Sequence, residues 1–174
     1  MMEHSTNGRR PEGEQMSEES RPNALAAFQT MMAFLEEDGW RPQRIEDKFV
    51  CRMNFRGDHA RIICFAQIRV DLEQFFFYAV APIMILEPAR PAVAEFLTRA
   101  NYGMLIGNFE LDFGDGEVRY KSALDFEGET LTPAWIRNAI YPAVDTLDRY
   151  MPGLLAVAFG NTPPAQAIAE IEGK

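Results

Sequence analysis

The sequence has 174 residues, enough for about one domain, with 47% hydrophobic and 25% charged residues. Its formal net charge of −9 argues against general binding to phosphate backbones or anionic membranes. The longest apolar run, residues 75–85, is too short to cross a bilayer, and two cysteines make no disulfide framework. The first residues do not have the pattern of a signal peptide, so we expect none. We therefore expect a cytoplasmic protein with no nucleic-acid or membrane partner.

Three parts of the chain differ in composition. Residues 1–21 are polar, rich in Glu, Ser and Gly, and almost free of large apolar side chains. Such a segment buries too little surface to offset the entropy lost on ordering, so we expect a disordered tail. Residues 22–160 are expected to form one α+β domain, and residues 161–174 a C-terminal extension.

The apolar pattern of the domain predicts the order helix, three strands, helix, two strands, helix. Helices are expected where apolar residues recur every three or four positions, and strands where they alternate. The expected helices run from Asn23 to Gly39, from about residue 88 to 103 and from Thr132 to Gly160, and the expected strands cover residues 48–56, 60–70, 75–80, 108–113 and 118–121.

Two of these elements carry further expectations. Pro142 and Pro152 each remove a backbone donor from the last helix, so kinks or short breaks are expected there. The strand at residues 75–80 is apolar on both faces. It is therefore expected to lie centrally in an antiparallel sheet that is flanked by helices and covered on both sides.

The first hairpin is predicted at Gly57-Asp58, a dipeptide typical of two-residue turns. Counting back along the alternating strands from such a turn places Cys51 directly opposite Cys64. We interpret the two cysteines as small buried residues with free thiols in a reducing compartment. A redox switch is the alternative interpretation.

The second hairpin is predicted at Asp115-Gly116, the strongest short turn signal in the chain. A type I′ turn at these residues pairs Phe113 with Val118. The same register sets acidic side chains opposite basic ones on the other face, so both faces favour it.

No motif for catalysis, cofactor binding or metal binding is recognisable. Asp112-Phe113-Gly114 matches the metal-binding triplet of protein kinases, but the other kinase motifs are missing. The carboxylates between residues 112 and 125 could hold a cation, although a solvated hairpin is the favoured reading. No motif places a nucleophile beside His4 or His59. We expect no catalytic, cofactor-binding or metal-binding residues and no enzyme activity.

The aromatic run at residues 75–78 is interpreted mainly as a core strand. If helices leave the other face of the sheet partly open, Phe65, Phe76 and Tyr78 are the expected partner surface. The leading hypothesis is a non-enzymatic adaptor that binds a protein client, basic or partly unfolded to suit the acidic charge, or a second copy of itself as a homodimer. The alternative is a small-molecule sensor with its ligand between the aromatic strand and a helix.

Several segments resemble the YbjN family. They are Phe96 to Asn101 (FLTRAN), Gly107 to Asp112 (GNFELD), Gly116 to Tyr120 (GEVRY) and Asp148 to Leu154 (DRYMPGL). The resemblance covers residues 23–160 and leaves the N-terminal tail outside.

The resemblance implies both a fold and a class of function. The family is described as bacterial regulators of sensory transduction, and its fold is similar to that of type III secretion chaperones, whose order of helices and strands matches the order predicted above. It therefore implies a bacterial protein-binding or regulatory role, and the dimeric state of secretion chaperones supports a homodimer. It brings no catalytic residues to carry over.

Overall fold

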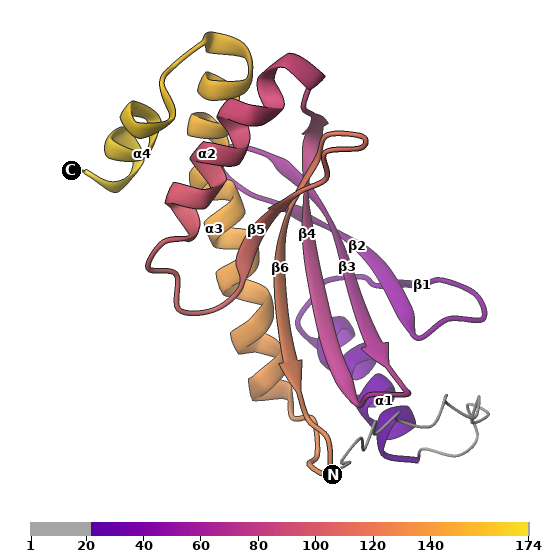
Figure 1. The fold of residues 1–174 in the computed structure, drawn as a ribbon. Coiled ribbons are helices and arrows are strands. Elements are labelled where there is room, and N and C mark those ends of the chain that lie inside the picture. The colour runs from indigo at the N-terminus through magenta and orange to yellow at the C-terminus, as the bar shows by residue number, and fades with distance from the viewer. Residues whose placement is uncertain (1–21, 174) are drawn as a thin grey trace, which may run out of the picture.

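The computed structural model describes residues 22–173 (Figure 1), so the predicted tail at residues 1–21 lies outside the described residues. The α+β class and the predicted order are confirmed, with short additional elements. The elements are α1 (Pro22–Glu37), β1 (Gln43–Arg44), β2 (Val50–Arg56), β3 (Arg61–Arg69), β4 (Gln74–Met84), η2 (Glu87–Ala89), α2 (Arg90–Asn101), β5 (Asn108–Leu111), β6 (Glu117–Asp125), α3 (Pro133–Gly160) and α4 (Pro164–Glu172).

The six strands form one antiparallel sheet in the order β1-β2-β3-β4-β6-β5, with β4 near its centre as predicted. Helices α1 and α3 lie against one face, and α2 packs on α3 and β5 (Figure 1). The strand side chains that turn toward these helices are buried: Cys51, Met53, Ile62, Cys64, Ala66, Ile68, Phe75, Phe77, Ala79, Val118 and Tyr120.

Within residues 22–173 no helix lies on the opposite face of the sheet, so this part of the chain does not provide the expected cover on both sides. Along β3 and β4 the residues alternate between buried and half-buried. The half-buried side chains include Phe76 and Tyr78, whose rings shield each other. Mutual contact of large side chains therefore replaces part of the expected helical cover.

Helix α3 begins as predicted and then continues without a break. The Thr132 side chain accepts a hydrogen bond from the Trp135 backbone N–H at 3.3 Å, with Pro at the first helical position. Short breaks at Pro142 and Pro152 are not found, because one helix runs from Pro133 to Gly160, and the alternative of a kink at each proline stays a prediction. Its apolar side is buried along its length against the sheet, and this packing outweighs two missing backbone hydrogen bonds.

The predicted C-terminal extension contains a packed helix, α4, which contacts α2 and α3. Ala167 of α4 is buried. The Tyr150 hydroxyl donates to Glu172 Oε1 at 2.9 Å, and Arg149 Nη2 donates to the Ile171 carbonyl at 3.2 Å. Residues 161–173 therefore complete the helical layer.

The β2–β3 hairpin differs in register from the predicted one. Arg56 pairs with Arg61, so the loop holds four residues, 57–60, instead of two. The shift is two residues, so every side chain keeps its predicted face. Cys51 and Cys64 become diagonal neighbours, and the prediction that they lie directly opposite each other is wrong.

A buried carboxylate from α3 explains the longer loop. Asp148 is only 8% exposed and accepts hydrogen bonds from the backbone N–H groups of Asp58 at 2.9 Å, His59 at 3.0 Å and Ala60 at 3.0 Å. A Cβ at Gly57 would overlap this carboxylate. The loop therefore opens to present three donors to one charge, and Gly57 leaves the room for it.

The β5–β6 hairpin is also shifted by two residues, since Leu111, and not Phe113, pairs with Val118. Phe113 lies in the loop and is 59% exposed. Gly116 has the expected positive φ, +87°, and its carbonyl accepts from the Ile85 N–H at 2.9 Å. This contact with the end of β4 fixes the loop in its longer form.

The two cysteines are free and buried on the helix-facing side of the sheet, as predicted. Burial raises the pKa of each thiol from 9.0 to about 12, and a backbone hydrogen bond at Cys51 only partly opposes this. The thiolate is the reactive form of cysteine. Both groups are therefore poor nucleophiles in the folded protein.

We expect both thiols to react slowly with a maleimide in the native protein and rapidly in denaturant. The raised pKa values also predict how the free energy of unfolding depends on pH. The contribution of the two thiols is constant below pH 9 and falls between about pH 9 and 12, because in that range the thiols ionise only in the unfolded protein. The slope is about 1.4 kcal/mol per pH unit per thiol. Labelling followed by mass spectrometry and urea unfolding from pH 7 to 11 check this. Rapid native labelling would contradict the burial of the cysteines.

Candidate functional site: the open face of the sheet

The candidate site is the side of the sheet that faces away from α1 and α3, called here the open face. Its centre is formed by half-buried apolar side chains from β2, β3 and β4. They are Val50, Ile63, Phe65, Phe76, Tyr78 and Val80. Because successive residues of a strand point to opposite faces, these six positions follow from the same alternation that builds the core.

The three predicted surface residues come together on this face. Phe65 is the direct cross-strand partner of Tyr78. The Phe76 and Tyr78 rings stack with centroids 6.1 Å apart and planes inclined by 11°. All three side chains are half-buried, so they form one aromatic platform that keeps solvent-facing surface.

On the β6 side of the platform, basic residues are paired with a carboxylate. The Arg119 guanidinium lies 4.6 Å from the centre of the Tyr78 ring and donates to Glu110 Oε2 at 2.8 Å. Lys121 forms a second ion pair with Glu110. Burial alone would raise the pKa of Glu110, but the hydrogen bonds from Lys121 and Arg119 hold it below its usual value. On this side of the platform, both basic side chains therefore have an ion-pair partner within the chain.

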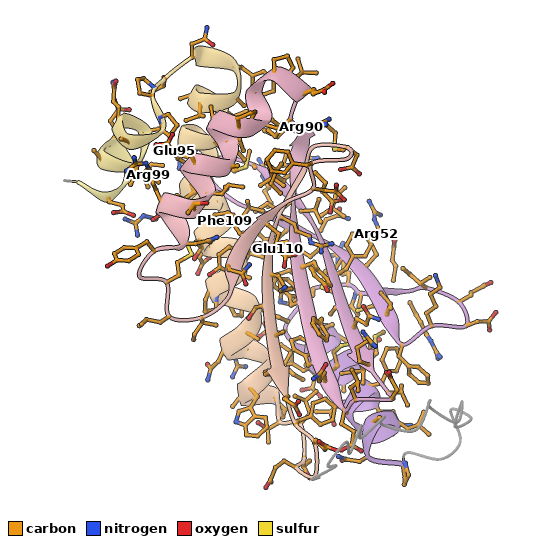
Figure 2. All side chains as sticks on the ribbon, viewed as in Figure 1. Arg52, Arg90, Glu95, Arg99, Phe109 and Glu110 are labelled. Carbon is orange, nitrogen blue, oxygen red and sulfur yellow. The ribbon has the colours of Figure 1, made fainter. Side chains whose placement is uncertain are left out.

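On the β2–β3 side, three arginines share the face without an ion pair among the described residues. They are Arg52, Arg56 and Arg61. Arg56 and Arg61 are direct cross-strand partners, an arrangement of like charges that destabilises a sheet. Figure 2 shows Arg52 and Glu110 on opposite sides of the face. The arrangement is suited to holding acidic groups beside an apolar platform.

The overall acidity of the chain conceals this local charge. Residues 41–69 contain seven basic and three acidic residues, although the whole chain carries a net charge of −9. The total charge favours a basic client, whereas the local charge of these residues favours an acidic one. The signal that could have revealed the basic side is the placement of Arg52 and Arg56 on one strand face and Arg61 on the same face of the next strand.

Four hollows on the described surface are lined by residues other than 75–78, beside which the ligand cavity was predicted. A polar hollow of about 490 Å³ is lined by Glu110, Leu111, Asp112, Phe113, Glu117 and Arg119. Three others, of about 300–330 Å³, lie over other elements. Phe75 and Phe77 are fully buried in the core. The hollows found in residues 22–173 thus lend no support to the small-molecule sensor.

The described residues form neither a metal site nor a membrane-spanning helix. No group of three or more His, Cys, Asp and Glu side chains is arranged to hold a metal ion in residues 22–173. The carboxylates between residues 112 and 125 instead make local contacts, such as Asp112 Oδ1 with the Gly114 N–H at 2.6 Å. Within the same range, every helix is too short or too polar to cross a membrane. His4 lies outside the described residues.

Comparison with known proteins identifies the fold and the family. The YbjN family model, described as "Putative bacterial sensory transduction regulator", matches residues 28–156. A solved structure described as "Crystal structure of YbjN, a putative transcription regulator from E. coli" is similar with a TM-score of 0.53 and 14% identity, over 74% of this chain and 89% of that chain. At this identity the likeness shows the fold alone. No curated protein matches the sequence.

Proposed function

The chain belongs to the YbjN family, and from this premise we propose that it is a non-enzymatic bacterial regulator that acts by binding a protein on its open face. The observation that carries the proposal is the aromatic platform of Phe65, Phe76 and Tyr78 beside arginines that have no ion-pair partner in the described chain. Aromatic and arginine side chains dominate the energetics of protein interfaces. An uncovered sheet face of this kind supports recognition better than catalysis.

The charges on the face indicate the chemistry of the client. Arg56 and Arg61 face each other at a cost in stability, and a carboxylate placed between them would relieve it. We propose a client segment that places apolar side chains on the platform and acidic side chains over the arginines. The net charge of −9 disfavours a long polyphosphate chain as the occupant.

The proposal also includes the cellular compartment of the protein and its oligomeric state. Two free cysteines are consistent with a reducing compartment, and we propose the cytoplasm. The other occupant that we propose for the open face is a second copy of the chain, which would make the protein a homodimer. Sedimentation of a 19.7 kDa species at tens of micromolar would rule out that dimer while leaving a client possible.

The variant Arg56→Glu separates binding from folding. The new carboxylate faces Arg61, so an opposite-charge pair replaces a like-charge pair and stability should hold or rise by a few tenths of a kcal/mol. Capture of the client from a bacterial lysate should nevertheless fall at least tenfold. The readout is quantitative mass spectrometry of proteins captured on immobilised full-length chain, with melting temperature measured in parallel.

The matched control is Arg99→Glu, which makes the same change in net charge on α2, where Arg99 is exposed and pairs with Glu95 (Figure 2). Capture should be unchanged with this variant. Equal capture by Arg56→Glu and the wild type would contradict the open face as the binding site. Loss of all capture after nuclease treatment would show that the partner is a nucleic acid and would contradict a protein client.

A further inference from the structure

Strand β6 continues beyond its neighbour at the edge of the sheet. β6 has nine residues and β5 has four, and their pairing ends where Asn108 meets Lys121. From Ser122 to Asp125 the inner side of β6 pairs with β4, and no described strand pairs with its outer side. Figure 1 shows β6 continuing past β5 with β4 on its other side. Among residues 22–173, this part of β6 is therefore a short open sheet edge.

This edge is open because the chain is turned away from it. Gly107 has a φ of +74°, and a Cβ there would lie 2.5 Å from Tyr120 Cε1 and 2.6 Å from the Lys121 carbonyl oxygen. The Tyr120 hydroxyl also donates to the carbonyl of Ile106. Both features fix the end of the α2–β5 loop against Tyr120 and Lys121, and the paired part of β5 begins only after this turn, at Asn108.

The backbone groups on the open edge can be assigned from their neighbours. The Phe126 N–H donates to the Glu73 carbonyl at 3.0 Å, toward the β4 side, whereas the Glu117 carbonyl accepts from the Asp112 N–H at 2.9 Å, toward the β5 side. Because the direction alternates along a strand, Ala123 and Asp125 turn their N–H and C=O groups outward. These groups are positioned to pair with one more extended strand.

A mainly apolar hollow of about 330 Å³ lies beside the same edge. Its lining consists of Ile106, Ser122, Ala123, Leu124, Asp125, Trp135, Asn138 and Ala139. Ile106 is 48% and Trp135 40% exposed, and the neighbouring Leu105 is 98% exposed. Asp125 is the one charged residue in this lining, and its contacts are with the neutral donors Gln74 and the Glu127 N–H.

We propose that this edge binds an extended segment of a partner protein, which adds as an antiparallel strand beside Ser122–Asp125. The free backbone groups require an extended chain. The hollow accepts an apolar side chain opposite Leu124, and the uncompensated carboxylate of Asp125 takes a Lys or Arg opposite it. This edge adjoins the open face, because Ala123 lies opposite Phe76, but the inference rests on the backbone edge and the hollow and does not depend on the proposed function.

The probe is a synthetic eight-residue peptide whose centre reads Lys-Leu-Thr-Val, so that Lys faces Asp125, Leu faces Leu124 and Thr faces Ala123. Titrated into the ¹⁵N-labelled full-length chain, it should shift the amide signals of Ala123 and Asp125. The same peptide with an N-methyl group on the Thr has the same side chains and lacks the N–H that would pair with Ala123. It should bind at least tenfold more weakly.

Protein variants give the complementary test. Ala123→Pro removes an outward N–H that β4 does not use, so the sheet should form while peptide binding is lost. Ala123→Ser is the matched control and should bind as the wild type does. If Ala123→Pro does not fold, two other measurements still test the inference. Trp135→Ser removes a wall of the hollow, and the N-methyl peptide lacks one N–H, so each should weaken binding at least tenfold.

Three results would overturn the inference. Equal binding of the N-methyl peptide would show that no strand is added. Shifts confined to Phe65, Phe76 and Tyr78 would place the peptide on the open face, which contradicts this inference and leaves the proposed function standing. Shifts of Ala123 and Asp125 that depend on protein concentration without peptide would identify a second copy as the occupant.

Discussion

Replacing Asp148 with alanine should lower the free energy of unfolding by about 3 kcal/mol. Each hydrogen bond to a charged group contributes about 1.5–3 kcal/mol, and the total loss is smaller than the sum because some of the freed loop N–H groups then bind water. The carboxylate is 8% exposed and accepts three backbone N–H groups from the β2–β3 loop. Urea unfolding followed by circular dichroism measures the change. Asp145→Ala, on the exposed side of the same helix, is the control and should change stability little.

The same contact predicts a strong coupling to Gly57. In the wild type, Gly57→Ala forces its Cβ into the Asp148 carboxylate and should cost about 2 kcal/mol or more. In the Asp148→Ala background the obstacle is gone and the cost should nearly vanish. Additive effects of the two substitutions would contradict the hairpin geometry described here.

Gly116→Ala should be about as damaging, at roughly 3 kcal/mol or more. The positive φ of +87° alone costs a residue with a side chain about 1–2 kcal/mol. The added Cβ would also overlap the Ile85 carbonyl oxygen and lie 2.9 Å from the Ile85 N, and backbone cannot rotate away as a side chain can. Thermal and urea unfolding should both show the loss.

Gly128→Ala isolates the conformational part of this effect. Gly128 also has a positive φ, +76°, but a Cβ there meets nothing within 4 Å. Its replacement should cost about 1–2 kcal/mol, the price of φ alone. If Gly116→Ala cost no more than Gly128→Ala, the contact between the second hairpin loop and the end of β4 would be refuted.

These two sites show where prediction from the sequence succeeds and where it stops. Alternation correctly assigned the faces of β2, β3 and β4, and the Thr132 cap was correctly placed. Both hairpin registers were wrong by two residues. Their causes are Asp148, about 90 residues from the first loop, and Ile85, about 30 residues from the second. Turn propensities describe only the loop itself and contain neither contact.

The candidate site was predictable to a similar extent. Phe65, Phe76 and Tyr78 share a face because of strand parity, and this could be derived from the sequence. Whether a helix covers these three side chains could not be derived from the sequence, because it depends on which side of the sheet the helices occupy. The open edge of β6 was also missed, since it depends on where β5 begins, and this is set by the contacts of Gly107 with Tyr120 and Lys121.

Site-specific photo-cross-linking in bacterial cells tests the central claim, protein binding on the open face, most directly. A benzoylphenylalanine in place of Tyr78 should yield a discrete cross-linked protein, because Tyr78 lies in the aromatic platform. The same group in place of Phe159, which is 55% exposed on α3, should yield none above background. Absence of any Tyr78 cross-link to a protein, with the variant folded and expressed at the wild-type level, would contradict the proposed function.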